Sequence, residues 1–196
     1  MNDADIRWAP EALPAIVAET ERLGFRMASE AKTGAFLASL AASKPGGRIL
    51  ELGTGTGYGT SWLLAGMDST SRLDTVDRDP TVLAVARRYL GGDPRVEFHL
   101  AEGAHFLRSV LPHQFDLVFA DAWAGKFTDL DEALALLKVG GIYVIDDLLP
   151  QLSWPPGHAP NVEALVERLD VHPEFRSAKL SWATGLMIAV RTGAPN

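Results

Sequence analysis

The 196-residue sequence predicts an α/β fold built on a doubly wound sheet of seven strands, most of them parallel. Short apolar runs alternate with helical stretches from residue 48 onward, the rhythm of a parallel sheet with right-handed crossovers. Runs such as LVFA at 117–120 and IYVI at 142–145 are apolar on both faces, so helices should cover both faces. The expected architecture is therefore Rossmann-like, with an antiparallel hairpin at the C-terminal end.

Five strands should form the parallel part of the sheet. They are expected over residues 48–52, 73–77, 96–101, 115–121 and 142–147. The intervening helices should begin near Tyr58 and span residues 80–90, 104–110 and 130–138. Pro80 stands at the start of the helix expected over 80–90, and glycines follow the ends of this helix and of the helix expected over 130–138. Both features are typical of helix boundaries.

The pattern changes after the fifth strand. A segment rich in proline and tryptophan, residues 149–160, precedes a helix over 162–169 and strands over 175–182 and 186–190. Only three residues separate these two strands, so they should form an antiparallel hairpin. The first 44 residues show two helical stretches, about 10–23 and 29–42, and we expect them to form a helical cap on a core domain of residues 45–196.

Composition limits the classes of partner. The chain carries 18 basic and 25 acidic side chains, a net charge of −7, and nucleic acid is not expected because phosphate binding needs a basic surface. No apolar run approaches the roughly 20 residues of a membrane helix, and the start lacks a signal-peptide pattern. With no cysteine there are no disulfides or thiol nucleophiles. We expect one cytoplasmic domain without membrane or nucleic-acid partners.

The segment ELGTGTGYG, residues 51–59, joins the first strand to its helix at the edge where open α/β sheets bind ligands. Glycine permits positive φ and close approach of a ligand to the main chain. A dinucleotide-binding turn has the spacing G-x-G-x-x-G, and here its third glycine position holds Tyr58 or Thr60, depending on the first glycine counted. The spacing opposes a dehydrogenase. In a turn of this kind the carboxylate of a ligand can meet free amides at a helix N-terminus; the alternative is a turn that serves only to reverse the chain.

Two acidic residues lie at or just after the ends of the next two strands. Asp77 ends the second strand, where a carboxylate can accept both ribose hydroxyls of a nucleoside; the alternative is a helix or turn cap. Glu102 follows the third strand and can accept from an adenine amino group; the alternative is a turn carboxylate facing solvent. Together with the glycines, their order indicates a nucleoside site.

The pattern E-x-G-x-G-x-G at residues 51–57, followed by these acids, resembles class I S-adenosylmethionine-dependent methyltransferases, and more narrowly the catechol and caffeoyl-CoA type of O-methyltransferase. The likeness runs from about residue 27 to the end of the chain. It implies S-adenosylmethionine as cofactor and methylation of a hydroxyl on a small-molecule acceptor. The cofactor-binding residues that it implies are Glu51, Gly53, Thr54, Gly55, Gly57, Tyr58, Gly59, Asp77, Glu102, Gly103, Asp121 and Trp123.

The same resemblance implies a divalent cation such as Mg²⁺. Family members hold it with an Asp after the fourth strand and an Asp-Asn pair after the fifth, and the corresponding residues here are Asp121, Asp146 and Asp147. Carboxylate oxygens are the ligands that Mg²⁺ prefers, and a bound cation would orient the acceptor oxygen. The chain departs from the family at Asp147, where a third carboxylate replaces the amide.

Asp121, Lys126 and His158 are the predicted catalytic residues. The family lysine stands three residues after the first Asp, and that position is Ala124 here. Lys126 lies two residues further on and acts as a base only where its amine loses its proton. His158, in the loop after the fifth strand, is the competing base.

Two other functions stay open on the sequence. The chain could methylate nitrogen or carbon without a metal, which the alanine at position 124 favours, or it could bind the cofactor without turnover and act through partners. The N-terminal helices and the C-terminal hairpin offer surfaces on which a homodimer would form.

Overall fold

The computed structural model describes residues 5–151 and 154–193. The strands are β1 (Arg48–Leu52), β2 (Arg72–Asp77), β3 (Val96–Leu100), β4 (Phe115–Ala120), β5 (Leu137–Ile145), β6 (Phe175–Leu180) and β7 (Leu186–Arg191). The helices are α1 (Leu13–Leu23), α2 (Ala31–Ala42), α3 (Tyr58–Gly66), α4 (Pro80–Leu90), α5 (Gly103–Ser109), α6 (Leu130–Ala135) and α7 (His158–Asp170).

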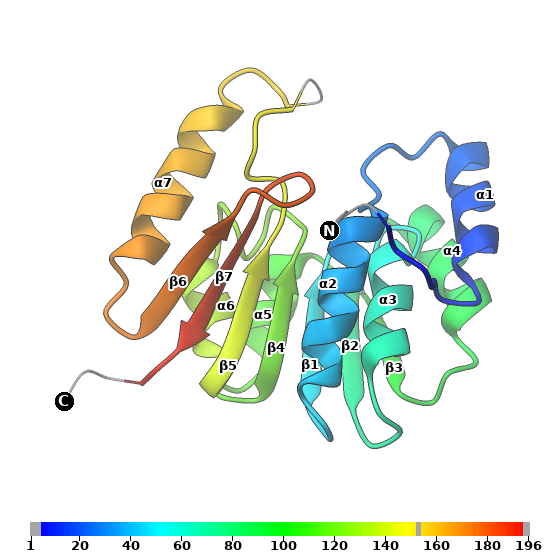
Figure 1. Cartoon of the computed structure of the whole chain (residues 1–196), viewed down its shortest axis with the longest axis horizontal. Helices are drawn as coiled ribbons and strands as arrows, with labels where there is room; N and C mark the ends of the chain where they lie inside the picture. Colours follow the sequence, from blue (N-terminus) through cyan, green and yellow to red (C-terminus); the bar gives the residue numbers. More distant parts are fainter. Residues whose placement is uncertain (1–4, 152–153, 194–196) are drawn as a thin grey trace.

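All seven strands belong to one sheet in the order β3-β2-β1-β4-β5-β7-β6 (Figure 1). The first five strands run parallel, and β7 lies antiparallel between β5 and β6. Helices cover both faces of the sheet (Figure 1). The predicted Rossmann-like architecture and its C-terminal hairpin are therefore confirmed. Within the described residues, no helix has the length and apolar character needed to cross a membrane.

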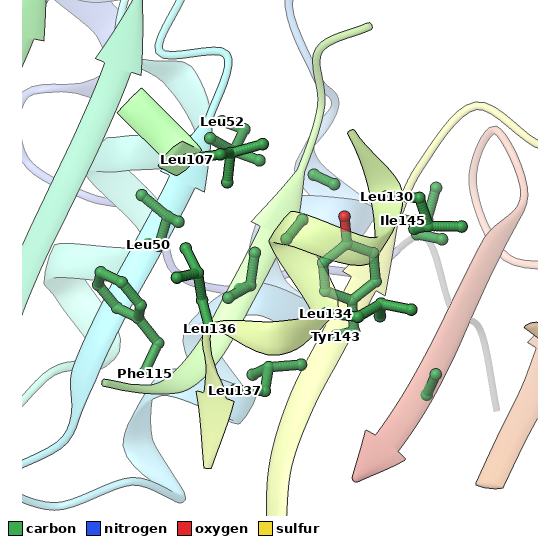
Figure 2. Close-up of a cluster of buried hydrophobic side chains, with 14 of the residues drawn as sticks. Leu50, Leu52, Leu107, Phe115, Leu130, Leu134, Leu136, Leu137, Tyr143 and Ile145 are labelled. Atoms are coloured by element: carbon green, nitrogen blue, oxygen red, sulfur yellow. The ribbon is translucent and has the colours of Figure 1, made fainter. Parts of the chain in front are cut away.

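Each face of the sheet carries its own apolar core. Leu50 and Leu52 of β1 lie in the cluster with Leu107 of α5 and residues of α6 (Figure 2), to which α7 also contributes. Ile49, between them, points to the opposite face and packs with Leu37 of α2 and Leu63 of α3. Alternate residues of a strand face opposite sides, so one fully buried strand serves both cores.

The N-terminal helices pack closely on the second of these faces. Ile16 of α1 and Leu37 of α2 are fully buried in the core cluster. The approach of α2 to α3 requires glycine, because a Cβ at Gly34 would lie 2.4 Å from the Trp62 ring and a Cβ at Gly66 would lie 2.0 Å from the carbonyl oxygen of Ala38. These helices thus contribute directly to the core.

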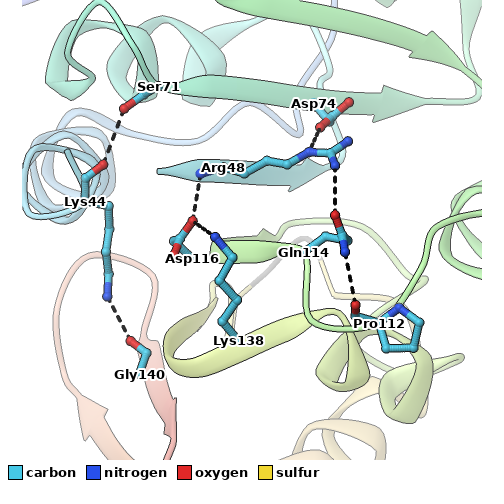
Figure 3. A network of polar contacts seen from close by, with 9 residues as sticks. All are labelled: Lys44, Arg48, Ser71, Asp74, Pro112, Gln114, Asp116, Lys138 and Gly140. Atoms are coloured by element: carbon cyan, nitrogen blue, oxygen red, sulfur yellow. Dashed lines mark hydrogen bonds and ion pairs between the residues drawn. The ribbon is translucent and has the colours of Figure 1, made fainter. Parts of the chain in front are cut away.

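Hydrogen bonds and ion pairs stabilise the edge of the sheet where the parallel strands begin (Figure 3). The carboxylate of Asp116 accepts hydrogen bonds from the Arg48 amide at 2.8 Å and from the Lys138 ammonium at 2.7 Å. Lys44 donates to the Gly140 carbonyl at 2.8 Å. These bonds join the start of β1 to β4 and β5. The loops that carry the predicted site residues lie at the opposite edge, where these strands end.

The prediction was wrong at the junction of α6 and β5. A helix was expected over 130–138 and a strand from 142, but the helix ends at Ala135 and the strand begins at Leu137. Amides just before β4 bond the carbonyls at the end of α6: His113 donates to Ala135, the last residue of the helix, and Gln114 donates to Leu136, the residue after it. The glycine at 140, with φ of 80°, lies inside the strand instead of capping the helix.

Other boundaries differ from the expected ones by two to four residues, among them the ends of two C-terminal elements. The last helix was expected over 162–169 but begins at His158, directly after Gly157 with φ of 81°. Pro160 lies in its first turn, where the missing amide has no partner to lose. The strand expected over 175–182 ends at Leu180, where its pairing with β7 ends.

Replacing Gly66 with alanine should destabilise the protein by about 1–3 kcal/mol, because the new Cβ would collide with the Ala38 carbonyl, which belongs to the backbone of α2. Gly92→Ala is the matched control, since no atom lies within 4 Å of its Cβ position. Urea unfolding measures both. Equal midpoints for the two variants would contradict the proposed tight contact of α2 and α3.

Candidate functional site

The loops after β1 and β4 meet where the strand order reverses. The Asp121 amide donates to the Leu52 carbonyl at 2.8 Å. A Cβ at Gly53 would lie 2.5 Å from the carbonyl oxygen of Asp121, so only glycine fits there. In open α/β sheets, ligands bind outside the carboxyl ends of the strands at such a reversal.

The glycine turn lies at this edge of the sheet, and amides within it are bonded to the protein itself: Gly53 donates to the Val76 carbonyl and Gly57 to the Thr54 carbonyl, both at 2.9 Å. Gly53, Gly55 and Gly57 have φ of 100°, 53° and 94°, values that side chains rarely tolerate. Helix α3 begins directly afterwards, and Gly57 supplies no side-chain cap for its first amides. The turn therefore offers backbone donors at a helix N-terminus, which is a site suited to an anionic group.

Two further predicted residues, Tyr58 and Gly59, lie at the start of α3 and have structural contacts. Gly59 lies within α3, where a Cβ would come 2.5 Å from Oε1 of Glu51. Tyr58 packs against the cluster of Leu13 and Trp62, and burial raises the pKa of its hydroxyl.

Glu51 is buried beneath the turn, with 1% of the residue exposed. Its Oε2 accepts hydrogen bonds from Thr60 at 2.5 Å and from Thr75 at 2.6 Å. The Thr54 hydroxyl lies 2.6 Å from that of Thr75 and extends the chain of hydroxyls. Burial raises the pKa of Glu51 to about 8, against the lowering effect of the threonines. The carboxyl therefore keeps its proton at neutral pH, and its Oε1 has no partner within the described residues.

Asp77 faces the glycine turn from the end of β2. Its Oδ2 accepts from the Gly55 amide at 2.7 Å, and its Oδ1 accepts from the Asp79 amide at 2.9 Å. Glu102, by contrast, lies exposed after β3, with its carboxylate 3.8 Å from Arg78. Gly103 begins α5, and a Cβ there would lie 2.8 Å from the side chain of Ala124. All these residues lie at the carboxyl edge of the sheet.

Three aspartates and one lysine gather after β4 and β5. The ammonium of Lys126 lies 3.3 Å from Oδ1 of Asp121 and 4.0 Å from Oδ2 of Asp147. Burial raises the pKa of Asp121 to about 7; the nearby lysine opposes the rise, and the two other aspartates add to it. Burial also raises the pKa of Asp146, which accepts hydrogen bonds from the Thr184 hydroxyl and the Asp147 amide.

The three aspartates do not have the geometry of a cation site. Within the described residues, their ligand atoms do not come together within 4.8 Å as a group. The group that does so is Asp74, Glu97 and His99, on β2 and β3, and its Asp74 is paired with Arg48 at 3.0 Å. The divalent cation that the resemblance implies therefore does not fit the arrangement of the aspartates.

Aromatic rings surround His158 at the start of α7. Its ring centre lies 5.7 Å from Trp123, 5.0 Å from Phe127 and 4.8 Å from Trp154. Only 9% of His158 is exposed, and its Nδ1 has no partner within the described residues. Trp123, two residues after Asp121, is itself half exposed, so part of its ring is accessible.

Sequence reasoning missed the residues that reach this edge from distant elements. Thr184, in the β6–β7 turn, donates to Asp146, and the Thr20 hydroxyl of α1 lies 2.7 Å from that of Thr56 in the glycine turn. Phe25 stands over Gly55, 3.2 Å from its Cβ position. No local pattern marks these contacts, because each joins segments far apart along the chain.

The sheet order and the glycine turn at its carboxyl edge place the chain in the class of Rossmann-like α/β domains. The methyltransferase-domain family matches residues 50–148, just over half of the chain, and the protein belongs to that family. The match confirms the resemblance to class I methyltransferases.

Individual relatives agree with this assignment. A segment of 128 residues is 33% identical to a catechol O-methyltransferase of Mycobacterium tuberculosis, covering 63% of this chain and 58% of that protein. The chain thus spans less than two thirds of the curated relatives' length.

Solved structures match over nearly the whole chain. Cofactor-bound Rv0187 from MTB has a TM-score of 0.84 at 26% identity, covering 97% of this chain and 94% of that one. The O-methyltransferase TomG from Streptomyces achromogenes, solved with S-adenosylmethionine, has a TM-score of 0.80 at 24% identity, covering 93% and 90%, and shows the fold alone.

Glu51 should make the free energy of unfolding fall as the pH rises from 4.5 toward 8. Over this range the unfolded chain has released the proton and the folded chain still holds it, so ionisation favours unfolding. Glu51→Gln should remove this contribution, at most about 1.4 kcal/mol per pH unit. The advantage of the variant over the native protein should therefore grow with pH.

Urea unfolding of the cofactor-free protein between pH 5 and 8 measures this difference. Glu132→Gln, on the exposed surface of α6, is the matched control. A constant difference between Glu51→Gln and the native protein across the range would show that the buried carboxyl is ionised throughout.

Proposed function

We propose that the chain binds S-adenosylmethionine at the glycine turn and transfers its methyl group to a hydroxyl oxygen of a small-molecule acceptor. The observation that carries the proposal is the glycine turn from Gly53 to Gly57, with positive φ at its three glycines and with the carboxylate of Asp77 at 2.7 Å from the Gly55 amide. Membership in the methyltransferase-domain family supports it.

Each part of the cofactor has a proposed partner. The amides at the start of α3 would take its carboxylate. Asp77 would accept the ribose hydroxyls. Glu102 would accept from the adenine amino group, and Trp123 would supply an exposed aromatic face near Asp121.

The acceptor would lie beside Asp121 and Lys126, at the end of β4. A lone pair of the acceptor oxygen forms the new bond to the methyl carbon, and the electrons of the broken bond return to sulfur, which leaves S-adenosylhomocysteine. The hydroxyl proton passes to one of the two predicted bases, Lys126 or His158. Of these, His158 has the unpartnered Nδ1, whereas Lys126 is ion-paired with Asp121. Positioning in line with the sulfonium supplies much of the rate.

Oxygen is favoured over nitrogen or carbon as the acceptor atom, because the curated relatives are named as O-methyltransferases. The divalent cation is left out of the proposed chemistry, because the aspartates do not converge on a common point. A homodimer stays a prediction.

Isothermal titration calorimetry with S-adenosylmethionine tests the cofactor assignment. The native protein should bind it, and Asp77→Ala should weaken binding by about 30-fold, or about 2 kcal/mol, because hydrogen bonds from the ribose to a carboxylate are lost. Asp131→Ala removes an exposed acid that pairs with Arg168 in α7 and should leave the affinity unchanged. Absence of binding to the folded native protein would refute the assignment.

Mass spectrometry of products from a panel of phenols, catechols, amines and carbon acids tests the acceptor. A methyl ether should form, and methylated amines should stay at background level. Products carrying the methyl group on nitrogen or carbon would replace the O-methylation proposal with the alternative methyltransferase. Cofactor binding with no product from any class would favour a binding module without turnover.

A further inference from the structure

Lys126 lies among the three aspartates that the resemblance assigns to a cation. Only 6% of the residue is exposed, and its ammonium is 3.3 Å from Asp121 and 4.0 Å from Asp147. A buried ammonium at this place supplies the positive charge that the carboxylates need.

The loop after β4 is folded so that Lys126 returns to the site from a position two residues beyond that of the family lysine. Gly125 has φ of 88°, its amide donates to Thr128 at 2.7 Å, and its carbonyl accepts from the Tyr143 hydroxyl at 2.5 Å. A Cβ at Gly125 would lie 2.7 Å from the side chain of Leu52. The tight turn at Gly125 therefore compensates for the alanine at 124.

The aspartates also lack the spacing that a divalent cation requires. Mg²⁺ and Ca²⁺ bind oxygens at about 2.0–2.6 Å, so two ligands of one ion lie at most about 5 Å apart. Asp121, Asp146 and Asp147 do not form a group within 4.8 Å.

Their oxygens are in addition engaged by the protein. Oδ1 of Asp146 accepts from the Thr184 hydroxyl and from the Asp147 amide, the latter at 2.7 Å. Oδ1 of Asp147 accepts from the Gln151 amide group at 2.7 Å. Bringing these carboxylates around one ion would break several of these bonds as well as the contacts with Lys126.

We propose that the Lys126 ammonium takes the place of the divalent cation and donates a hydrogen bond to the acceptor oxygen. The proposal rests on the proposed function, because it concerns the acceptor of that reaction. An ammonium carries three N–H donors, and Asp121 accepts one of them. Lys126 then lends the acceptor oxygen a fixed positive charge and stays protonated, so the acceptor proton passes to His158, the other predicted base, and no metal is needed.

This arrangement changes the class of acceptor. A cation that orients a catechol uses two neighbouring oxygens, whereas an ammonium needs only one. Acceptors with a single hydroxyl should therefore react as well as vicinal diols, with kcat/KM values within about tenfold of each other.

Titration with Mn²⁺, followed by electron paramagnetic resonance, tests whether the three aspartates bind a divalent cation and needs no turnover. The background is Glu97→Ala, which removes one member of the separate Asp74, Glu97 and His99 group. Titrations of this protein and of Glu97→Ala/Asp147→Ala should superimpose. Asp147 is half exposed, so its replacement puts folding at little risk. A clear loss of Mn²⁺ affinity on adding Asp147→Ala would show a real site at the aspartates and overturn the proposal.

Steady-state kinetics in the presence of a chelator tests whether Lys126, rather than a metal ion, supports the reaction. Native kcat/KM should be unchanged in EDTA, and Lys126→Met, which keeps the aliphatic stem, should lower kcat/KM by about 100-fold. The dissociation constant of S-adenosylmethionine should stay within about threefold, which shows that the variant is folded. Lys179→Met, which breaks an exposed pair with Asp170, is the control and should have native kinetics.

Loss of native activity in EDTA, or native kcat/KM in Lys126→Met, would overturn the proposal. The Mn²⁺ titration gives its answer even if no acceptor is methylated, so failure of the proposed function and failure of this inference are distinguishable.

Discussion

The main chains that follow β1 and β4 touch each other, and the geometry of the whole site depends on that contact. The carbonyl oxygen of Asp121 would lie 2.5 Å from any Cβ at Gly53, so a side chain there would force the two loops apart. The contact is possible because β1 and β4 are parallel neighbours whose ends, Leu52 and Ala120, lie side by side. It brings the proposed cofactor turn beside the proposed acceptor cluster.

Buried charge sets the electrostatics of this edge. Glu51 stays neutral because burial raises its pKa to about 8. Asp121 has a pKa of about 7, so its protonated and ionised forms are present in similar amounts at neutral pH. Lys126 is the cation in contact with Asp121 and Asp147 among the described residues. A sulfonium bound nearby would be stabilised by the remaining negative charge, since interactions between charges are strong in a partly buried site.

The sequence predicted those parts of the molecule that depend on local pattern. The apolar runs located the strands, and the glycine spacing located the turn that adopts positive φ at Gly53, Gly55 and Gly57. The end of α6 could not be predicted, because backbone amides before β4 decide it. The position of Lys126 depends on the hydrogen bond from the Tyr143 hydroxyl to the Gly125 carbonyl, and the position of Asp146 depends on the hydrogen bond from Thr184. Both bonds join residues far apart along the chain, so no local sequence pattern predicts them.

A crystal structure of the complex with S-adenosylhomocysteine tests the central claim most directly. In the cofactor-free structure the Gly55 amide donates to Asp77 at 2.7 Å. The complex should show the nucleoside lying along the main chain from Gly53 to Gly57, with both ribose hydroxyls bonded to Asp77. A nucleoside bound elsewhere, with Phe25 still covering Gly55, would contradict the account.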